Sequence, residues 1–428
     1  MRHLILCTFG ILLSLPLWAQ SNSPVILIKA GHVLDVKTGQ MLNDREILVQ
    51  GDRIRSMGAA GSNRDFKGTV IDLSRATVLP GLIDCHTHLF LHPGILEEQA
   101  TKETATYRTL IAGVNARKTL EAGFTALRDL GNEGADFGDV SVRDAINNGF
   151  IPGPRLQVAT RAIAMTGSHD DIKGYNFELH LPGFSMIADG PDEVRKAVRT
   201  QIKYGADIIK VYATGGIMTP GDEPEYSEFT EQEIRVAVEE AAHQGRKVAA
   251  HAMGPQGIKN AVRAGVASIE HGDLIDDEAI RMMAAKHVYL VPTLTAGDEI
   301  LKSPNLPDFA LRKMRRVADI QKTGLLKAVK AGVPIALGTD AGDFPHGQNA
   351  REFALMVDVG MTPLQALQAG TINAAELLGW SDRMGALEPG KFADIIAFEG
   401  DPLRDVHVLE HVHFVMKGGV VVKNDWAR

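Results

Sequence analysis

The chain has 428 residues, of which 45% are hydrophobic, so it is long enough for a large core and a smaller companion domain. Its formal net charge is −8, which disfavours nucleic acids and anionic membrane surfaces as partners, because both are negatively charged.

The first segment of the chain is typical of a secretory signal peptide. A short basic start precedes an almost unbroken apolar run over residues 4–18, and Ala19 then leads into a polar stretch. The apolar run is too short to span a bilayer comfortably, so we predict a signal peptide over residues 1–19 and export to the periplasm or the exterior. An uncleaved membrane anchor is the alternative. Cys7 would leave with this segment and Cys85 would remain alone, so no internal disulfide is expected.

Short strands and turns are expected at both ends of the rest of the chain. Residues 24–77 contain four short apolar or alternating runs separated by Gly, Asn and Asp, as in a small antiparallel sheet. Similar runs return over residues 385–428. The economical arrangement pairs both ends of the chain in one small β-sandwich domain.

The central part of the chain, residues 78–384, alternates between short apolar runs and amphipathic helical patterns. Several of the helical patterns end in a glycine just before the next apolar run, which is typical of a helix C-terminus at a junction with a strand. Eight strand–helix alternations indicate an α/β fold, a TIM-like (β/α)8 barrel. The candidate strands are residues 78–85, 124–129, 155–160, 207–213, 247–251, 267–271, 288–294 and 335–339.

Two histidines close the first predicted barrel strand. His86 and His88 are two residues apart, so both side chains lie on one face of a strand and can reach one metal ion. The pattern alone is weak, because fifteen histidines in 428 residues give roughly 0.5 such pairs by chance. A second pair, His411 and His413, is interpreted as structural or surface. Position favours the first pair, since these barrels keep their active sites at the carboxyl ends of the strands.

Four more residues of the metal-ligand type end later predicted strands: Lys210, His251, His271 and Asp340. Each could be an ordinary polar strand end. A lysine flanked by apolar residues in a buried strand is costly unless it is paired or modified. Ligand-type side chains at the ends of five strands, all converging on one mouth, predict a metal centre.

These segments together resemble the amidohydrolase superfamily over nearly the whole mature chain. The resemblance is carried by the motifs P-G-L-I-D-C-H-T-H-L, I-K-V-Y-A-T-G-G, A-A-H-A, I-E-H-G and G-T-D-A-G. Within the superfamily, I-K-V-Y-A-T-G-G and T-G-S-H resemble the branch of Xaa-Pro dipeptidases, imidazolonepropionase-related enzymes and ochratoxinase-like carboxypeptidases.

The resemblance implies a centre with two divalent metal ions, zinc being the expected element. His86, His88 and Asp340 would hold one ion, and His251 and His271 the other. Lys210 would bridge them as a carbamate formed with CO2. Two metals lower the pKa of a shared water to give hydroxide, and Asp340 would take its proton and hand it to the leaving nitrogen.

Two further residues are implied to bind the substrate. His169 follows the third predicted strand and would contact a C-terminal carboxylate. Tyr212 shares a strand face with Lys210 and would contact the carbonyl oxygen. A packing role is the alternative for both. The family usually has T-G-G-H where this chain has Ser168 in the third position, which could shift the loop.

The remaining polar or small residues near the expected site have plainer interpretations. Arg128 and Asp129 are expected to form an internal salt bridge. His346 could line the pocket or lie in a solvated loop. Cys85 is interpreted as a packing residue. Gly215-Gly216 would let the backbone approach the site, although a plain turn is equally economical.

The sequence therefore predicts an exported enzyme that hydrolyses amide bonds of dipeptides or N-acyl amino acids, with ochratoxin-type amides among the candidate substrates. The alternative is a mononuclear deaminase or a hydrolase of cyclic amides, such as an imidazolonepropionase-like enzyme, and Lys210 argues against it. A non-catalytic relative is disfavoured because all six ligand-type residues are present. The resemblance also implies a homo-oligomer, with an octamer among the assemblies it suggests.

Overall fold

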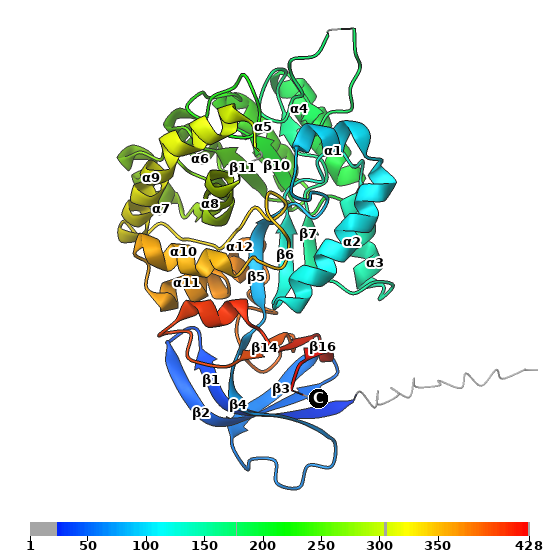
Figure 1. Ribbon diagram of the computed structural model, residues 1–428, viewed down its shortest axis with the longest axis vertical. Helices are drawn as coiled ribbons and strands as arrows, with labels where there is room; N and C mark the ends of the chain where they lie inside the picture. The colour runs from blue at the N-terminus through cyan, green and yellow to red at the C-terminus, as the bar shows by residue number, and fades with distance from the viewer. Residues whose placement is uncertain (1–23, 177, 304–305, 427–428) are drawn as a thin grey trace, which may run out of the picture.

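The computed structural model describes residues 24–176, 178–303 and 306–426. They form a barrel of strands and helices at one end of the molecule and a smaller β domain at the other (Figure 1). Among these residues, no helix is both long and apolar enough to cross a membrane. The predicted signal peptide, residues 1–19, lies outside the described residues.

The β domain is one seven-stranded sheet built from both ends of the chain, and Figure 1 shows the blue and red segments side by side. The sheet order is β16-β15-β14-β4-β1-β2-β3. The two ends meet where β4 pairs with β14 and Pro80 lies opposite Ile395. The strands are β1 (Val25–Asp35), β2 (Gln40–Gln50), β3 (Arg53–Ala59), β4 (Thr69–Pro80), β14 (Ile395–Phe398), β15 (Phe414–Lys417) and β16 (Val420–Asn424).

One pairing in this sheet differs from the antiparallel arrangement predicted for residues 24–77. β1 and β2, and β2 and β3, are antiparallel, but β4 runs parallel to β1. β4 has to run in this direction because its end leads within two residues into the first barrel strand, β5 (Leu82–Thr87). It therefore connects the two parts of the molecule.

The barrel strands lie close to their predicted positions. After β5 come β6 (Phe124–Asp129), β7 (Arg155–Val158), β10 (Ile209–Tyr212), β11 (Val248–Ala252), β12 (Ser268–His271) and β13 (Tyr289–Val291). Their pairings are parallel. Two-residue strands β8 (Ile163–Ala164) and β9 (Met186–Ile187) belong to the long connection after β7. The predicted α/β barrel with an added β domain is confirmed.

The eighth barrel position is an irregular segment, where a regular strand over residues 335–339 was expected. It is bridged to β13 at Ile335 and to β5 at Ala341. A side chain at Gly338 would bring its Cβ within 2.8 Å of Cβ of His86. The segment therefore passes very close to the first strand.

Helices cover the outside of the strands (Figure 1). Their ends follow the expected chemistry: Thr230 and Glu233 form a capping box at the start of α5, and Gly265 ends α6 in a left-handed conformation with φ 98°. The helices are α1 (Leu96–Lys102), α2 (Ala105–Glu121), α3 (Gly138–Asn147), α4 (Gly190–Lys203), α5 (Glu231–Ala242), α6 (Pro255–Ala264), α7 (Asp277–Lys286), α8 (Leu294–Lys302), α9 (Asp308–Lys330), α10 (Arg351–Val359), α11 (Pro363–Ala369) and α12 (Ile372–Leu378), with a 3₁₀ helix at Val406–Glu410.

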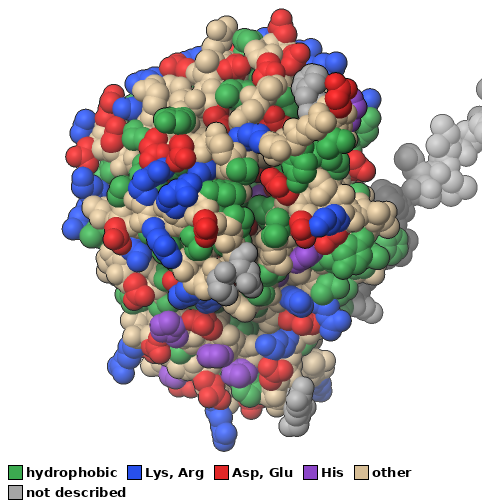
Figure 2. All heavy atoms as spheres, turned by 45° about the horizontal axis from the view of Figure 1, so that its top comes forward, with side chains coloured by type: hydrophobic (Ala, Val, Ile, Leu, Met, Phe, Trp, Pro, Cys, Tyr) green, Lys and Arg blue, Asp and Glu red, His purple; other side chains and the backbone are tan. Residues whose placement is uncertain are grey.

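Charged side chains of both signs are intermingled over the face shown in Figure 2, and among the coloured side chains there no continuous basic patch is visible. This distribution agrees with the acidic net charge of −8. Such a mixed surface lacks the continuous positive charge that nucleic-acid binding uses on the face shown.

Candidate active site

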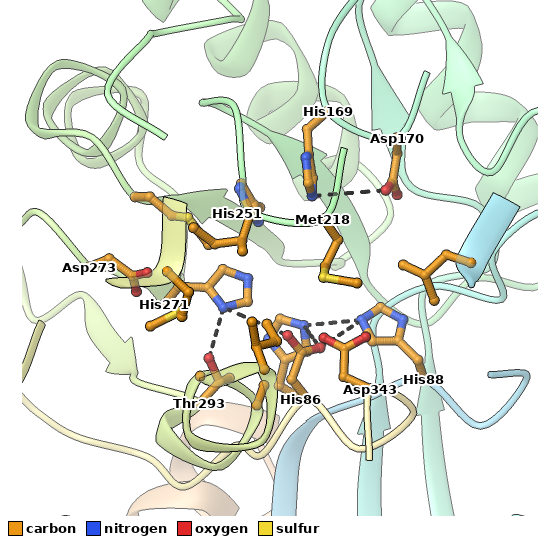
Figure 3. A pocket seen from close by; sticks show the side chains of 18 of the residues that line it. His86, His88, His169, Asp170, Met218, His251, His271, Asp273, Thr293 and Asp343 are labelled. Carbon is orange, nitrogen blue, oxygen red and sulfur yellow. Dashed lines mark hydrogen bonds and ion pairs between the residues drawn. The ribbon is translucent and has the colours of Figure 1, made fainter. Parts of the chain in front are cut away.

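One pocket at the carboxyl ends of the barrel strands gathers all eight site residues that the sequence predicts (Figure 3). The strand register explains why they meet. Tyr212 of β10 lies opposite His251 of β11, and Ala252 of β11 lies opposite His271 of β12. The pocket lining includes His86, His88, His169, Lys210, Tyr212, His251, His271 and Asp340.

The tightest group in the pocket is formed by His86, His88 and Asp340, whose side chains could hold one metal ion. Oδ1 of Asp340 lies 3.3 Å from Nε2 of His86 and 3.1 Å from Nε2 of His88. The two Nε2 atoms are 3.3 Å apart. Three ligand atoms at such mutual distances point to a common centre.

The other nitrogen of each ring is held by an acceptor. Nδ1 of His86 donates to the Glu270 carboxylate at 3.0 Å, and Nδ1 of His88 lies 3.1 Å from the carbonyl oxygen of Gly131 and 3.0 Å from Glu133. A neutral imidazole that carries its proton on Nδ1 presents a lone pair at Nε2. Two lone pairs facing each other at hydrogen-bond distance repel unless a cation or a proton lies between them.

The acceptors around His88 also favour a positive charge at this place. Burial opposes its charged form, yet hydrogen bonds to Asp340 and Glu133 raise the pKa of His88 well above its usual value. A metal ion would satisfy the same acceptors. The donor set therefore fits a divalent cation of the kind that imidazole and carboxylate bind.

A second group lies beside the first. The ring of His271 is 5.0 Å from that of His86 and 4.6 Å from that of His251. Burial and neighbouring positive groups hold the pKa values of His251 and His271 well below their usual range, so both rings are neutral at pH 7 and can act as ligands. Nδ1 of His271 lies 2.8 Å from the hydroxyl of Thr293.

Lys210 is buried and lines the same pocket, and its charge acts on His86, His251 and His271. Burial lowers the pKa of its amine and Arg128 adds to this effect, while the nearby carboxylates of Glu270 and Asp340 oppose it in part. A neutral amine is the form that reacts with CO2, so the environment of Lys210 fits the expected carbamate.

Arg128 forms its internal ion pair with Glu270, and not with the neighbouring Asp129 as expected. Its guanidinium contacts both Glu270 oxygens at 2.9 and 3.0 Å, while Asp129 accepts a hydrogen bond from the backbone N–H of Leu89. Adjacent residues of a strand point to opposite faces, which separates Arg128 from Asp129. Glu270 thereby joins Arg128 to His86.

His169 belongs to a network of buried charges on another side of the pocket. Its Nδ1 lies 3.0 Å from Asp222, which also pairs with Lys313 at 2.9 Å. A side chain at Gly216 would bring its Cβ within 2.4 Å of the His169 ring, so this glycine allows a close backbone approach. The hydroxyl of Tyr212 donates a hydrogen bond to Asp170.

Backbone strain is concentrated at the pocket. Among the described residues, nine non-glycine residues have a positive φ, and five of them line the pocket. Such conformations cost energy and persist where the surrounding structure enforces them, often at functional sites. The five are Glu133, Asp170, His271, Thr293 and Asp340.

Other residues noted in the sequence lie outside the pocket lining. His346 is buried behind His88, with Nε2 3.2 Å from the His88 carbonyl oxygen, so it neither lines the pocket nor lies in solvent. Cys85 is fully buried in an apolar cluster, as expected for a packing residue. His413 lies 3.6 Å from Asp425 in the β domain, away from the pocket.

The sequence interpretation missed several acidic residues of the pocket, among them Glu133, Asp170, Asp273 and Asp343. Asp273 is 2% exposed, and its Oδ1 accepts a hydrogen bond from Gln321 at 2.8 Å. Burial raises the pKa of Asp273 to about 7. Its position two residues after His271 was the available signal, since loops that follow barrel strands line the mouth.

Comparisons with known proteins agree with this geometry. The sequence matches the amidohydrolase family over residues 77–422. It is 35% identical to ochratoxinase from Aspergillus niger, covering 94% of this chain and 87% of the relative. It is 29% identical to imidazolonepropionase from Geobacillus kaustophilus, covering 95% of each. A crystal structure of a Xaa-Pro dipeptidase with bound methionine in the active site superposes with a TM-score of 0.86 and 37% identity, covering 94% of this chain and 100% of that one.

Proposed function

Since the chain belongs to the amidohydrolase family and is a hydrolytic enzyme of amide bonds, we propose that it cleaves dipeptides or N-acyl amino acids with two divalent metal ions. The branch is that of ochratoxinase, imidazolonepropionase and Xaa-Pro dipeptidase.

The observation that carries the proposal is the convergence of the His86 and His88 Nε2 atoms on Oδ1 of Asp340, all within 3.3 Å of one another. These three side chains would hold one ion. His251 and His271 would hold the second, since both are neutral and face the same pocket. The buried amine of Lys210, once carboxylated, would supply an anionic bridge.

The metal ions would supply Lewis-acid activation of water and of the amide carbonyl. The protein residues orient the substrate and transfer protons. The Asp340 carboxylate lies at the centre of the group, where it can accept a proton from the attacking water and return it to the leaving nitrogen.

Substrate contacts are proposed for His169 and Tyr212. The His169 ring stacks on His251 at 4.7 Å, which places it beside the proposed second metal site, where it can bind a carboxylate. The Tyr212 ring lies 5.1 Å from that of His251, so it also borders the proposed second metal site, and its hydroxyl would contact the scissile carbonyl. The hydrogen bond from Tyr212 to Asp170 fixes the orientation of this ring.

The relatives support the proposed substrate class. Ochratoxinase and the Xaa-Pro dipeptidase are the relatives of highest identity described above, at 35% and 37%. A second candidate, hydrolysis of a cyclic amide with one metal ion, is favoured by the likeness to imidazolonepropionase at 29%. Lys210 disfavours it, because a bridging ligand is needed only between two ions.

The test uses the full mature chain, metal-stripped and then reloaded with zinc. A panel of Xaa-Pro, Xaa-Phe and N-acyl amino acids is offered to both forms. We expect hydrolysis by the reloaded form alone, with half-maximal recovery near one zinc per chain and full recovery near two. Hydrolysis that survives exhaustive stripping, or full recovery at one ion per chain, rules out the two-metal proposal.

Export and self-association remain predictions from the sequence. Amino-terminal sequencing of the protein secreted by its host tests cleavage near Ala19. Light scattering after size-exclusion chromatography measures the number of subunits.

A further inference from the structure

A carboxylate and an amide form a polar pair on the wall of the pocket, outside the proposed metal ligands. Oδ1 of Asp273 accepts a hydrogen bond from Nε2 of Gln321 at 2.8 Å, and the same Nε2 donates to the carbonyl oxygen of Pro292 at 2.9 Å. Both donors of the amide are therefore used, and the amide group is fixed. Gln321 in turn fixes the Asp273 carboxylate.

Asp273 lacks a charge partner among the residues that the structure describes. Its Oδ2 has no hydrogen-bond partner there, and the nearby charged group that acts on it is Asp340, which has the same sign. The side chain is only 2% exposed, yet it lines the pocket. A carboxylate removed from water in this way is stabilised by a cation that enters the pocket.

The carboxylate and the proposed carboxylate-binding residue lie at different edges of the pocket. Figure 3 shows Asp273 beyond His271, and His169 with Asp170 at another edge of the proposed metal centre. A substrate that spans the metal centre with one end near His169 can thus bring its other end to Asp273. In a dipeptide, those two ends are the carboxylate and the ammonium group.

An apolar recess adjoins the polar pair. Gly297 borders it and lets Met314 pack closely, since an added Cβ there would lie 2.8 Å from Cε of Met314 and 3.8 Å from Oε1 of Gln321. Met253, Ile300 and Met314 line the same pocket and belong to one buried cluster. Flexible methionines suit an apolar side chain of irregular shape.

We propose that Asp273, positioned by Gln321, binds the free α-ammonium group of a dipeptide whose amino-terminal side chain is apolar and packs against the pocket wall formed by Met253, Ile300 and Met314. This inference rests on the proposed function and selects dipeptides over N-acyl amino acids within it. Asp273 acts on binding and specificity. It is not assigned a part in the bond-breaking step.

The test compares Leu-Phe with 4-methylpentanoyl-Phe, which has the same side chain and amide bond but lacks the amino group. We expect zinc-loaded wild-type protein to prefer Leu-Phe by about 10- to 100-fold in kcat/KM, the range typical of one hydrogen-bonded charge. Asp273→Asn should lose this preference through a higher KM for Leu-Phe. Its rate with the analogue should stay within about twofold of wild type.

Asp319→Asn is the matched control, because Asp319 is an exposed acid on the same helix as Gln321 and should leave both rates unchanged. Equal rates of wild type with both compounds would overturn the assignment, as would a variant that slows both alike. Hydrolysis of neither compound would refute the proposed function. In that case the binding of Leu-Phe is measured by calorimetry. The role proposed for Asp273 requires Leu-Phe to bind more tightly to wild type than to Asp273→Asn.

Discussion

The Glu270 carboxylate accepts a hydrogen bond from Nδ1 of His86 at 3.0 Å, and both side chains are buried. The same carboxylate is paired with the Arg128 guanidinium at 2.9 Å. Arg128 keeps Glu270 ionised, and Glu270 keeps the His86 proton on Nδ1. The Nε2 atom is then free to act as a ligand.

Glu270→Gln should weaken the metal centre and the fold together. The variant leaves Arg128 as a buried charge without its partner, which costs about 3–5 kcal/mol. Replacement of the carboxylate that accepts from His86 by a neutral amide should lower metal affinity about 10- to 100-fold. Chemical denaturation and a chelator competition measure the two effects. In the control Glu376→Gln, which removes an exposed partner of His287 at 3.2 Å, stability should change by less than about 1 kcal/mol.

Lys210→Met should abolish hydrolysis while the chain stays folded, because it removes the proposed bridge and replaces a buried amine with an apolar side chain of similar size. Intact-protein mass spectrometry of wild type should show added CO2 that is absent from the variant. Activity of metal-free protein reloaded with zinc should depend on bicarbonate. A variant that binds two zinc ions and works at the wild-type rate would exclude the carbamate bridge.

Asp222→Asn should disturb substrate binding and stability. It removes the partner of buried Lys313 at 2.9 Å and of His169 at 3.0 Å, so we expect a loss of about 3–5 kcal/mol and a raised KM. Glu223→Gln serves as the comparison, since it removes only one of the two acidic partners of exposed Arg316. If both variants melted at the same temperature and had the same KM, the buried network would not have the role described.

Lys417 in the β domain should make stability rise with pH in the alkaline range. Burial and the nearby charge of Arg155 lower the pKa of Lys417 to about 8 from its usual value of 10.5. Between these two values the unfolded chain binds a proton that the folded chain has released, so stability increases as pH rises from about 8 to about 10.5. We expect a contribution of about 3 kcal/mol. The difference between wild type and Lys417→Met in urea unfolding isolates it, and parallel pH profiles would refute it.

Much of the site could be predicted because its residues end parallel strands, and such ends meet at one mouth. His86, Lys210, His251 and His271 each follow an apolar run that the sequence displays. The partners behind them could not be predicted in the same way. Glu270 and Arg128 are 142 residues apart in the chain. The sequence around a buried arginine does not indicate which distant carboxylate will pair with it.

The features that could not be predicted are loop conformations and strand pairings. Residues 335–339 look like an ordinary apolar strand in the sequence, but the eighth segment is irregular, forms isolated bridges and passes close to His86 at Gly338. The parallel pairing of β4 with β1 depends on how the chain enters the barrel, which is a tertiary constraint. Asp273 lies in a loop, where hydrophobic periodicity gives no signal about orientation.

The most direct test of the account is an anomalous difference map at the zinc absorption edge, from crystals of the mature protein grown with zinc. The account predicts two peaks in each chain, one bound by Nε2 of His86 and His88 together with Asp340, the other by His251 and His271, with Lys210 contacting both. A map with one peak or none in this pocket, from protein that still hydrolyses its substrate, would contradict it.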